Sequence, residues 1–373
     1  MPGDNRQRTL IHILSDNRWG GIARYALDIC RHFKAEGWNV MAFTIDAKAV
    51  DALFSKEGVT LLHAPFWGTF DIESARKLAQ TLRTLPKDSV TIHAHGFRNA
   101  FTALLARKLA ARKDVRIVMT RHKVKRGIDS WLFRRIYRNL DAMIFVSELA
   151  RDRFLSTWHS RELPFPADRL HVIHNSLNLP VEDPAERTEK GPVTAMFHGP
   201  LVPGKGIEIL IDALTRLKGS RMRLRIVGSG TPDYVDRMRR RAITRGVMDM
   251  IDWRKHSDNP LGHIREIDFG VLPSVTEEAF GLANAEYMLC GRPLICSSNG
   301  AQPEYITDGR EGFLVPPGNT AMLADAMRKL ATDADLRQRM GERAYATFRD
   351  TLSWPHFIES LTPLYLPDPI NKP

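Results

Sequence analysis

Short apolar runs alternate with amphipathic stretches along most of the chain. This alternation is typical of parallel β-sheets whose strands are joined by crossover helices. In the first half it predicts strands at residues 10–14, 40–43, 90–93, 117–120, 142–146 and 170–173. Amphipathic stretches at 22–35, 73–85 and 101–112 predict helices between these strands.

A polar, proline-bearing segment at residues 180–192 (PVEDPAERTEKGP) interrupts the alternation and predicts a linker. Six further strands are expected at 193–197, 223–227, 250–253, 269–272, 293–296 and 312–315. The pattern predicts two doubly wound α/β domains at 1–180 and 193–350, with a linker at 181–192 and a tail at 351–373. Ligands of such sheets lie beyond the carboxyl ends of the strands, which predicts a ligand in a cleft between the two domains.

The composition agrees with a globular protein of this size. The 373 residues exceed what one core usually serves, and 43% of them are hydrophobic while 26% are charged. No apolar run approaches the roughly 20 residues that span a bilayer, and the first residues carry no hydrophobic signal core. A cytoplasmic location is therefore expected. Three irregularly spaced cysteines indicate neither a disulfide framework nor a zinc site.

Positive charge is concentrated in the first half of the chain. Residues 1–180 contain 29 Lys and Arg against 17 Asp and Glu, whereas the remainder contains 25 against 26. The excess is densest between Arg98 and Arg153. Such a surface attracts polyanions and anionic membranes, which favours an anionic or membrane-anchored partner and a peripheral position at the inner face of the membrane. Solvated helix faces are the alternative interpretation.

The strongest chemical pattern is the segment 273–291, PSVTEEAFGLANAEYMLCG. If Phe280 begins a helix, Glu278 lies in the loop that faces the helix N-terminus, and Glu286 lies further along the helix. Free amides at that N-terminus attract a diphosphate, and a nearby carboxylate can accept hydrogen bonds from sugar hydroxyls. The alternative is that Glu278 is a favourable N-terminal charge and Glu286 a solvated one.

Three further positions suit the same ligand. Gly20 and Gly21 follow the first strand and open a helix, where glycine lets the backbone approach a phosphate, although a simple tight turn is the alternative. Lys205 lies at a helix entrance, where a cation is unfavourable unless an anion offsets it. His122 follows a strand, and His95 ends the preceding strand and is its expected neighbour in the sheet, although for each a satisfied core or loop histidine is the alternative.

The segment containing Glu278, Phe280, Gly281, Leu282 and Glu286 resembles the donor-binding motif of retaining glycosyltransferase family 4, the group 1 glycosyltransferases. The resemblance covers nearly the whole chain and implies the GT-B fold, in which two Rossmann-like domains face each other across a cleft. It implies that Glu278 and the amides of residues 280–282 hold the transferred sugar and the diphosphate. Glu286 would then hold the ribose.

The resemblance also assigns roles outside that motif. Lys205 matches the lysine that contacts the diphosphate, and His122 matches the histidine that lines the reacting centre. Gly20 and Gly21 match the glycine-rich loop, and the tail would cross back onto the first domain. Pro200 departs from the family, whose members carry an arginine there, so that a second cation would have to come from Arg254, Lys255 or elsewhere.

Two other patterns suggest different chemistry and are discounted. Asp333 and Asp335 look like a metal-binding Asp-x-Asp motif but lie in a polar helical stretch, which predicts helix capping or a surface position. Gly228 and Gly230 follow a strand without the third glycine and the acidic residue of a dinucleotide fingerprint, so NAD is not expected. No cofactor, no metal and no nucleic acid are expected.

The resemblance implies a retaining, metal-independent hexosyltransferase with a nucleotide diphosphate sugar, such as a UDP-sugar, as donor. A hydroxyl of a glycan or lipid-linked acceptor would receive the sugar, in the synthesis of bacterial cell-surface polysaccharide or lipopolysaccharide. A nucleotide-sugar epimerase is an alternative that would need no acceptor. A non-catalytic nucleotide-sugar binder is another, because Pro200 removes a family cation.

Overall fold

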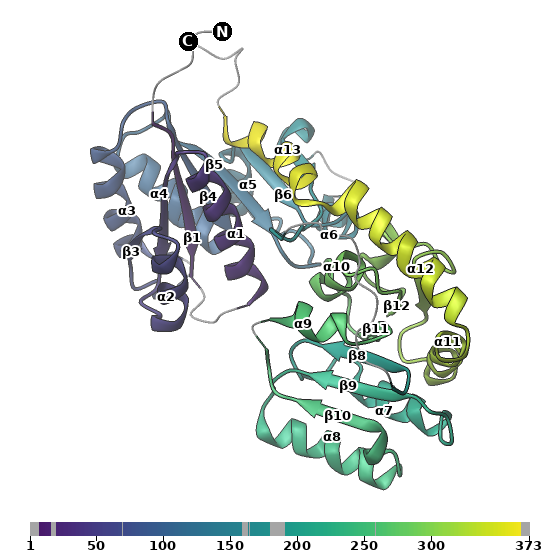
Figure 1. Cartoon of the computed structure of the whole chain (residues 1–373). Helices are drawn as coiled ribbons and strands as arrows, with labels where there is room; N and C mark the ends of the chain where they lie inside the picture. Colours follow the sequence, from purple (N-terminus) through teal and green to yellow (C-terminus); the bar gives the residue numbers. More distant parts are fainter. Residues whose placement is uncertain are drawn as a thin grey trace. The chain divides into compact units, whose positions relative to one another are not determined.

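Thirteen strands form two all-parallel sheets within the residues that the structure describes, which are 7–15, 20–68, 70–158, 163, 165–179, 191–257 and 259–366. The computed structural model divides the chain into two units, each built around one sheet (Figure 1). Unit 1 comprises Met1–Asn178 and Phe357–Pro373, and unit 2 comprises Leu179–His356. The α/β class and the doubly wound parallel sheets that the sequence predicts are confirmed.

The sheet of unit 1 has seven strands in the order β3-β2-β1-β4-β5-β6-β7. These are β1 (Thr9–Leu14), β2 (Asn39–Thr44), β3 (Thr60–His63), β4 (Val90–His95), β5 (Arg116–Arg121), β6 (Ala142–Phe145) and β7 (Leu170–Val172). The helices are α1 (Gly21–Ala35), α2 (Lys48–Lys56), α3 (Ile72–Thr84), α4 (Phe97–Leu109), α5 (Trp131–Arg138) and α6 (Glu148–Leu155). Because all the strands are parallel, their carboxyl ends meet at one edge of the sheet.

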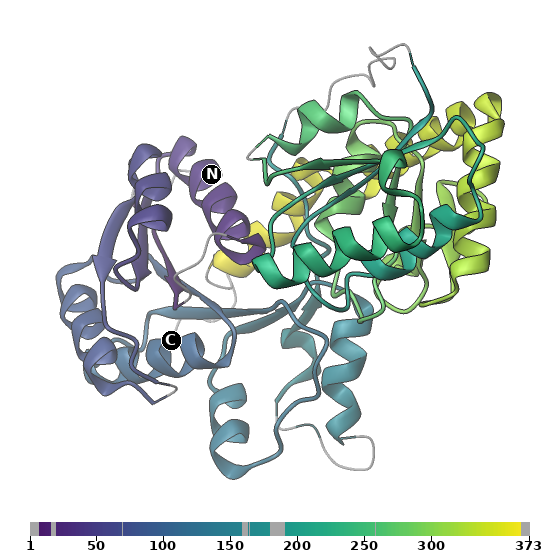
Figure 2. The ribbon, with the colours of Figure 1, turned by 90° about the horizontal axis from the view of Figure 1, so that it is seen from below.

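The two faces of this sheet have different chemistry. Successive side chains of β1 point to opposite faces, so Ile11 and Ile13 join the apolar core beneath α3, α4 and α5. His12 lies between them on the other face, where its ring packs against the ring of His93. Tyr25 of α1 packs edge-on against the same ring of His93. In Figure 2 the purple helix α1 lies on one side of the strands and the blue helices on the other.

The last helix, α13 (Trp354–Tyr365), ends in unit 1 beside the histidine-bearing face. Thr91 donates a hydrogen bond through Oγ1 to the carbonyl of Tyr365 at 2.9 Å, and Arg116 donates through Nε to the carbonyl of Leu364 at 2.6 Å. The C-terminal helix therefore completes the cover of the unit 1 sheet together with α1.

The sheet of unit 2 has six strands in the order β10-β9-β8-β11-β12-β13. These are β8 (Thr194–His198), β9 (Arg223–Val227), β10 (Ile251–Arg254), β11 (Phe269–Leu272), β12 (Leu294–Ser297) and β13 (Gly312–Val315). The helices are α7 (Ile207–Thr215), α8 (Pro232–Thr244), α9 (Pro260–Arg265), α10 (Leu282–Leu289), α11 (Thr320–Thr332) and α12 (Ala334–Thr347). In both sheets the first strand lies in the interior, and the order in which strands are added reverses there, as in doubly wound sheets.

All twelve predicted strands are present, and two details of the prediction are wrong. The sequence analysis missed β3, a four-residue edge strand whose side chains are at most half-buried, because its apolar signal is weak. Helix α4 begins at Phe97 rather than at residue 101, because Gly96 has a φ of 101° and provides the N-cap. Most of the predicted linker, residues 181–190, lies outside the described residues. Within the described part of the chain, no helix is long and apolar enough to cross a bilayer.

Candidate functional site

Two loops of unit 2 meet beyond the carboxyl ends of β8 and β11. One joins β8 to α7 and carries Lys205, and the other joins β11 to α10 and carries Glu278. Gly206 makes the contact feasible, because its φ is 77° and a Cβ atom there would lie 1.9 Å from the carbonyl oxygen of Pro273. Val275 donates its amide hydrogen to the carbonyl of Gly204 at 2.8 Å, which fixes the two loops to each other.

Glu278 accepts two hydrogen bonds on the same carboxylate oxygen. Lys205 Nζ lies 2.6 Å from Oε1 of Glu278, and Ser274 Oγ lies 2.5 Å from that atom. Lys205 and Glu278 are both largely buried, so their charges interact more strongly than a surface pair does. Glu278 is therefore held in place by a specific ammonium group and a specific hydroxyl group.

Helix α10 presents its N-terminus next to this pair. It begins at Leu282 with Gly281 as N-cap at a φ of 89°, so the prediction that Phe280 opens the helix is wrong by two residues. Phe280 is buried and lies just before the cap, where its carbonyl accepts the hydroxyl hydrogen of Tyr305. Asn284 Nδ2 donates to the same hydroxyl at 3.2 Å. Tyr305 thus anchors the loop that leads from Glu278 to the free amides of the helix.

Glu286 is buried on α10 rather than solvated. The residue is 3% exposed, and its carboxylate oxygen Oε2 lies 2.5 Å from Nε2 of His198 at the end of β8. Tyr287 donates its hydroxyl hydrogen to the carbonyl of Met196 and lies 2.8 Å from Nδ1 of His198. A proton must lie between Glu286 and His198 at this distance, so the two groups form a charge-assisted hydrogen bond. Sequence reasoning missed His198, for which only its position at a strand end was a signal.

Unit 1 carries its own polar cluster, beyond the carboxyl ends of β1, β4 and β5. Gly20 is the N-cap of α1, and among the described residues nothing lies within 4 Å of the place where a Cβ atom there would be. The prediction that Gly20 and Gly21 open a helix is confirmed. The residues Arg18 and Trp19 of the same motif lie outside the described residues.

Three histidines form a hydrogen-bonded chain in this cluster. His12 Nδ1 lies 2.9 Å from His95 Nε2, and His95 Nδ1 lies 3.1 Å from His122 Nε2. The prediction that His95 and His122 are neighbours is confirmed. Burial lowers the pKa of His12 to about 3, and burial together with the charge of Lys123 lowers the pKa of His122 to about 3. Burial lowers the pKa of His95 well below its usual value, so the three rings are uncharged at neutral pH.

A fourth histidine, His93 of β4, forms two hydrogen bonds next to this chain of histidines. Its Nδ1 lies 2.5 Å from the hydroxyl of Tyr365 and its Nε2 lies 2.7 Å from Oγ1 of Thr120. The sequence analysis assigned no role to His12 or His93. Their spacing was the available signal, since polar residues at alternate positions of apolar strands share one face of a sheet.

Two groups in the described part of the chain could each offer three metal ligands within 4.8 Å of one another. The first consists of His12, His93 and His95, whose nitrogens are largely engaged in the hydrogen bonds above. The second consists of Asp46 in the loop after β2, Asp51 of α2 and His63 at the end of β3. Thr44 Oγ1 contacts Asp51 at 3.1 Å and His63 at 3.3 Å. Neither group includes Lys205, Glu278 or the N-terminus of α10.

The patterns that were discounted on sequence have structural explanations. Asp333 caps α12 by accepting the amide hydrogen of Leu336 at 2.8 Å, as predicted. Gly228 and Gly230 lie against the carbonyl oxygens of Gly199 and Leu201, where a Cβ atom would clash at 2.0 and 2.1 Å. These glycines allow the loop after β8 to pack closely on the loop after β9.

Arg254, one candidate for the second cation that Pro200 leaves missing, forms an ion pair with Asp252. Pro200 is exposed in the loop after β8, and Arg254 directs Nε to Asp252 at 2.8 Å.

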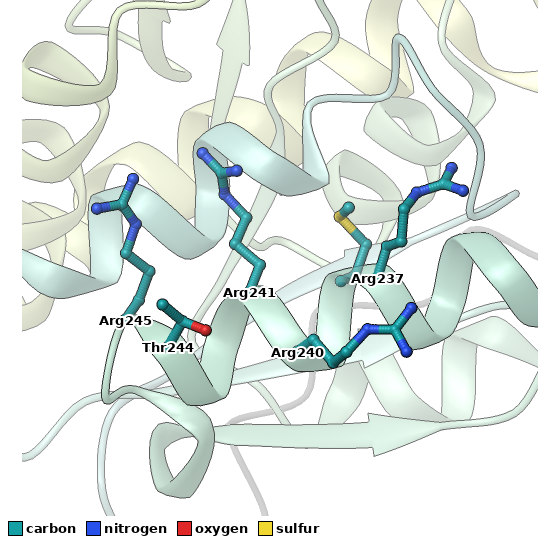
Figure 3. A pocket seen from close by; sticks show the side chains of 6 residues that line it. Arg237, Arg240, Arg241, Thr244 and Arg245 are labelled. Atoms are coloured by element: carbon teal, nitrogen blue, oxygen red, sulfur yellow. The ribbon is translucent and has the colours of Figure 1, made fainter.

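Unit 2 also has a cavity of about 630 Å³ on α8, lined by Arg237, Met238, Arg240, Arg241, Thr244 and Arg245 (Figure 3). Arg241 and Arg245 both bind the carboxylate of Asp212 there, so this arginine-rich surface is distinct from the loops around Lys205.

Comparison with known families assigns each half of the chain. The family described as "Glycosyl transferases group 1" matches residues 181–347, and the family described as "Glycosyltransferase Family 4" matches residues 19–179. Together the two matches include Lys205, Glu278, His122 and the Gly20 turn.

Individual relatives cover most of the chain. A D-inositol 3-phosphate glycosyltransferase of Jonesia denitrificans is 26% identical, over 93% of this chain and 91% of the relative. An O-antigen chain mannosyltransferase C of Escherichia coli is 28% identical, over 75% and 76%. The crystal structure of Anabaena Alr3699/HepE with UDP and glucose has a TM-score of 0.79 at 18% identity and covers 96% of this chain and 99% of that one. The last similarity shows that the two proteins share a fold.

Proposed function

Because this chain belongs to the family 4, group 1 glycosyltransferases with the GT-B fold, we propose that it is a retaining hexosyltransferase that uses a nucleotide diphosphate sugar. The acceptor in this proposal is a hydroxyl group of a glycan or of a lipid-linked saccharide. The observation that carries the proposal is the meeting of Lys205, Glu278 and the N-terminus of α10 at one edge of the unit 2 sheet.

Each part of this arrangement suits one part of such a donor. The ammonium of Lys205 and the backbone amides that begin at Leu282 are hydrogen-bond donors, and they favour a diphosphate. The carboxylate of Glu278 can accept hydrogen bonds from vicinal sugar hydroxyls, and Ser274 holds it in place. A bound diphosphate competes with Glu278 for Lys205, which frees carboxylate lone pairs for the sugar.

The proposed reaction breaks the bond between the anomeric carbon and the β-phosphate oxygen. Lys205 and the α10 amides stabilise the charge that develops on the departing diphosphate, in the way that fixed donors stabilise an oxyanion. The acceptor hydroxyl attacks the anomeric carbon from the face that the diphosphate leaves, and its proton passes to an oxygen of the departing phosphate. Glu278 positions the sugar and forms no covalent bond. No metal is required in this proposal, since Lys205 and backbone amides supply the positive charge.

Relatives support a choice of substrates for this proposal. The Anabaena protein was crystallised with UDP and glucose, which supports a UDP-sugar as donor. The E. coli relative is an O-antigen chain mannosyltransferase, which supports a role in cell-surface polysaccharide or lipopolysaccharide synthesis. His122 is the last member of the chain of three histidines in unit 1, and we propose that it lines the reacting centre.

Thermal unfolding with a panel of UDP-, GDP- and ADP-sugars tests the donor, because a bound ligand raises the unfolding midpoint by mass action. One nucleotide class should stabilise the protein, and proton NMR of the glycoside formed with a matching acceptor should show the anomeric configuration of the donor. Inverted configuration would contradict the retaining mechanism. Interconversion of donor sugars without an acceptor would instead indicate an epimerase, and binding without any turnover or hydrolysis a non-catalytic binder.

A further inference from the structure

A groove of about 980 Å³ runs along α4 and α5 of unit 1. We call this surface the α4–α5 face. Its apolar lining consists of Phe101, Leu104, Leu105, Leu132 and Ile136, and its exposed basic lining consists of Lys87, Lys108, Lys113 and Arg135. The lining residues of each helix recur every three or four positions, so each helix presents one continuous stripe to the groove. The face is therefore amphipathic.

The positive charge of this face is not neutralised locally. Asp114 is the acidic residue that lines the groove, and Arg112 binds it through Nε at 2.9 Å and Nη2 at 2.7 Å. This pairing lowers the pKa of Asp114 to about 2, so the carboxylate is ionised but already occupied. Among the described residues, the side chains of Lys87, Lys108, Lys113 and Arg135 form no ion pair. Four ammonium or guanidinium groups are thus available to an anionic partner.

Large aromatic side chains protrude from the same region. Trp131 begins α5, one turn before Arg135 on the same side of the helix, and it is 77% exposed. Phe70 is 53% exposed, and its ring packs edge-on against Phe101 of the groove at a centroid distance of 4.9 Å. The exposure of apolar ring surface to water costs free energy, whereas Trp side chains and nearby cations suit the boundary between lipid headgroups and acyl chains.

The arginine-rich surface of α8 in unit 2 provides a contrast (Figure 3). Arg237 and Arg240 are exposed there, but the large apolar side chain exposed on α8 is the aliphatic Ile243. Positive charge alone therefore does not distinguish the α4–α5 face. The combination of unpaired cations, an apolar groove and exposed aromatic rings does.

We propose that the α4–α5 face docks the protein on an anionic lipid bilayer. Lys87, Lys108, Lys113 and Arg135 contact lipid phosphates, while Trp131 and Phe70 enter the interfacial layer. The charge complementarity selects this occupant, because the groove offers cations and no free carboxylate. The inference rests on the proposed function only in that a membrane-anchored acceptor would give such docking a purpose.

Vesicle co-sedimentation of the full chain without substrates tests this proposal. The wild-type protein should bind vesicles of phosphatidylglycerol and phosphatidylcholine, bind pure phosphatidylcholine weakly, and lose binding to the anionic vesicles as salt screens the charges. Equal binding to both kinds of vesicle, or to neither, would overturn the proposal.

Matched variants locate the surface. Each basic residue beside an anionic membrane strengthens binding about fivefold, so the Lys108→Glu/Arg135→Glu variant should bind anionic vesicles at least about 25-fold more weakly. The Arg237→Glu/Arg240→Glu variant changes the net charge equally on α8 and should bind within about twofold of the wild type. Equal losses in the two variants would show that net charge, and not this face, drives binding, which overturns the proposal.

The aromatic contribution is measured separately. Trp131→Ala should weaken binding to anionic vesicles about tenfold, because a Trp side chain leaves water on docking. Ile243→Ala removes a 63% exposed apolar side chain from α8 and should leave binding unchanged. Thermal stabilisation by nucleotide sugars, measured on the wild-type protein, separates the two proposals. Stabilisation of a wild type that does not bind anionic vesicles overturns the docking alone, and vesicle binding by a wild type that no nucleotide sugar stabilises overturns the proposed function alone.

Discussion

The Nδ1 atom of His95 lies 3.1 Å from the Nε2 atom of His122. This contact joins the ends of two neighbouring strands, because His95 is the last residue of β4 and His122 follows β5 directly. On its other side His95 contacts His12, so the protonation of one ring constrains the next. A neutral imidazole has one donor and one acceptor nitrogen, and the chain can therefore have only two polarities.

The buried end of the chain selects between these polarities. His12 Nε2 has no hydrogen-bond partner among the described residues, and a buried N–H without an acceptor is rarer than a buried acceptor without a donor. His12 then carries its proton on Nδ1 and donates to His95, which donates to His122. We expect His122 to carry its proton on Nδ1, from which it can donate to a sugar or phosphate oxygen. Nitrogen-15 NMR of histidine-labelled protein checks this, with His122→Asn to assign the resonance. A protonated Nε2 on His122 would contradict it.

The buried histidines should make the protein sensitive to acid. The pKa of His12 is near 6.5 in the unfolded chain and about 3 in the folded protein. As the pH falls below 6.5, the unfolded chain therefore binds a proton that the folded protein does not bind. Stability is therefore fully present above pH 6.5 and declines towards pH 3. His12 alone should lower the free energy of unfolding by about 2 kcal/mol at pH 5. Thermal unfolding between pH 7.5 and 5 measures the effect, which should be smaller in His12→Phe. A midpoint independent of pH would contradict the expectation.

Removal of the Glu278 carboxylate should abolish most activity without unfolding the protein. Glu278→Ala should lower kcat by about 10²–10³, the effect of losing one group that orients or stabilises the reacting centre. The protein should stay folded, because the side chain lies in a loop beyond the sheet and the unpaired Lys205 side chain is 25% exposed to water. Glu277→Ala removes the neighbouring exposed carboxylate and should keep normal turnover. Equal activity of the two variants would remove Glu278 from the mechanism.

Lys205 should control affinity for the diphosphate. Lys205→Met keeps the length of the side chain but removes its charge and should weaken UDP binding about 10- to 100-fold, since hydrogen bonds to charged groups contribute roughly 1.5–3 kcal/mol. Isothermal titration calorimetry with UDP measures this directly. Lys218→Met removes an exposed lysine beyond α7 and serves as the control. Unchanged UDP affinity in Lys205→Met would exclude a contact with the diphosphate.

Gly206 should be intolerant of any side chain. Gly206→Ala places a Cβ atom 1.9 Å from the Pro273 carbonyl oxygen at a φ of 77°, so the loop that carries Lys205 must move away from the Glu278 loop. Gly219 has a similar φ of 84° with nothing within 4 Å, and Gly219→Ala isolates the backbone cost of about 1–2 kcal/mol. Thermal unfolding and UDP titration should show a larger loss in Gly206→Ala. Equal losses would show that the close approach is unimportant.

Local patterns predicted the elements that local forces determine. Alternating apolar runs identified twelve strands, because burial on both faces of a parallel sheet requires them. Glycine pairs and the glutamate motif identified the start of α1 and the loop before α10, because helix ends depend on a few adjacent residues. The start of α10 was misplaced by two residues, since Gly281 has a positive φ and Phe280 is fixed by Tyr305 from the loop after β12.

The sequence by itself determined the α/β class, the parallel sheets and the segments that carry Lys205 and Glu278. Only the tertiary structure decided that His198 binds Glu286, that His12 continues the chain of His95 and His122, and that α4 and α5 form an amphipathic groove. His198 and Glu286 are 88 residues apart in sequence, and His12 and His95 are 83 apart. Periodicity shows which face a side chain occupies, but strand order and helix packing decide which distant side chain lies within hydrogen-bonding distance.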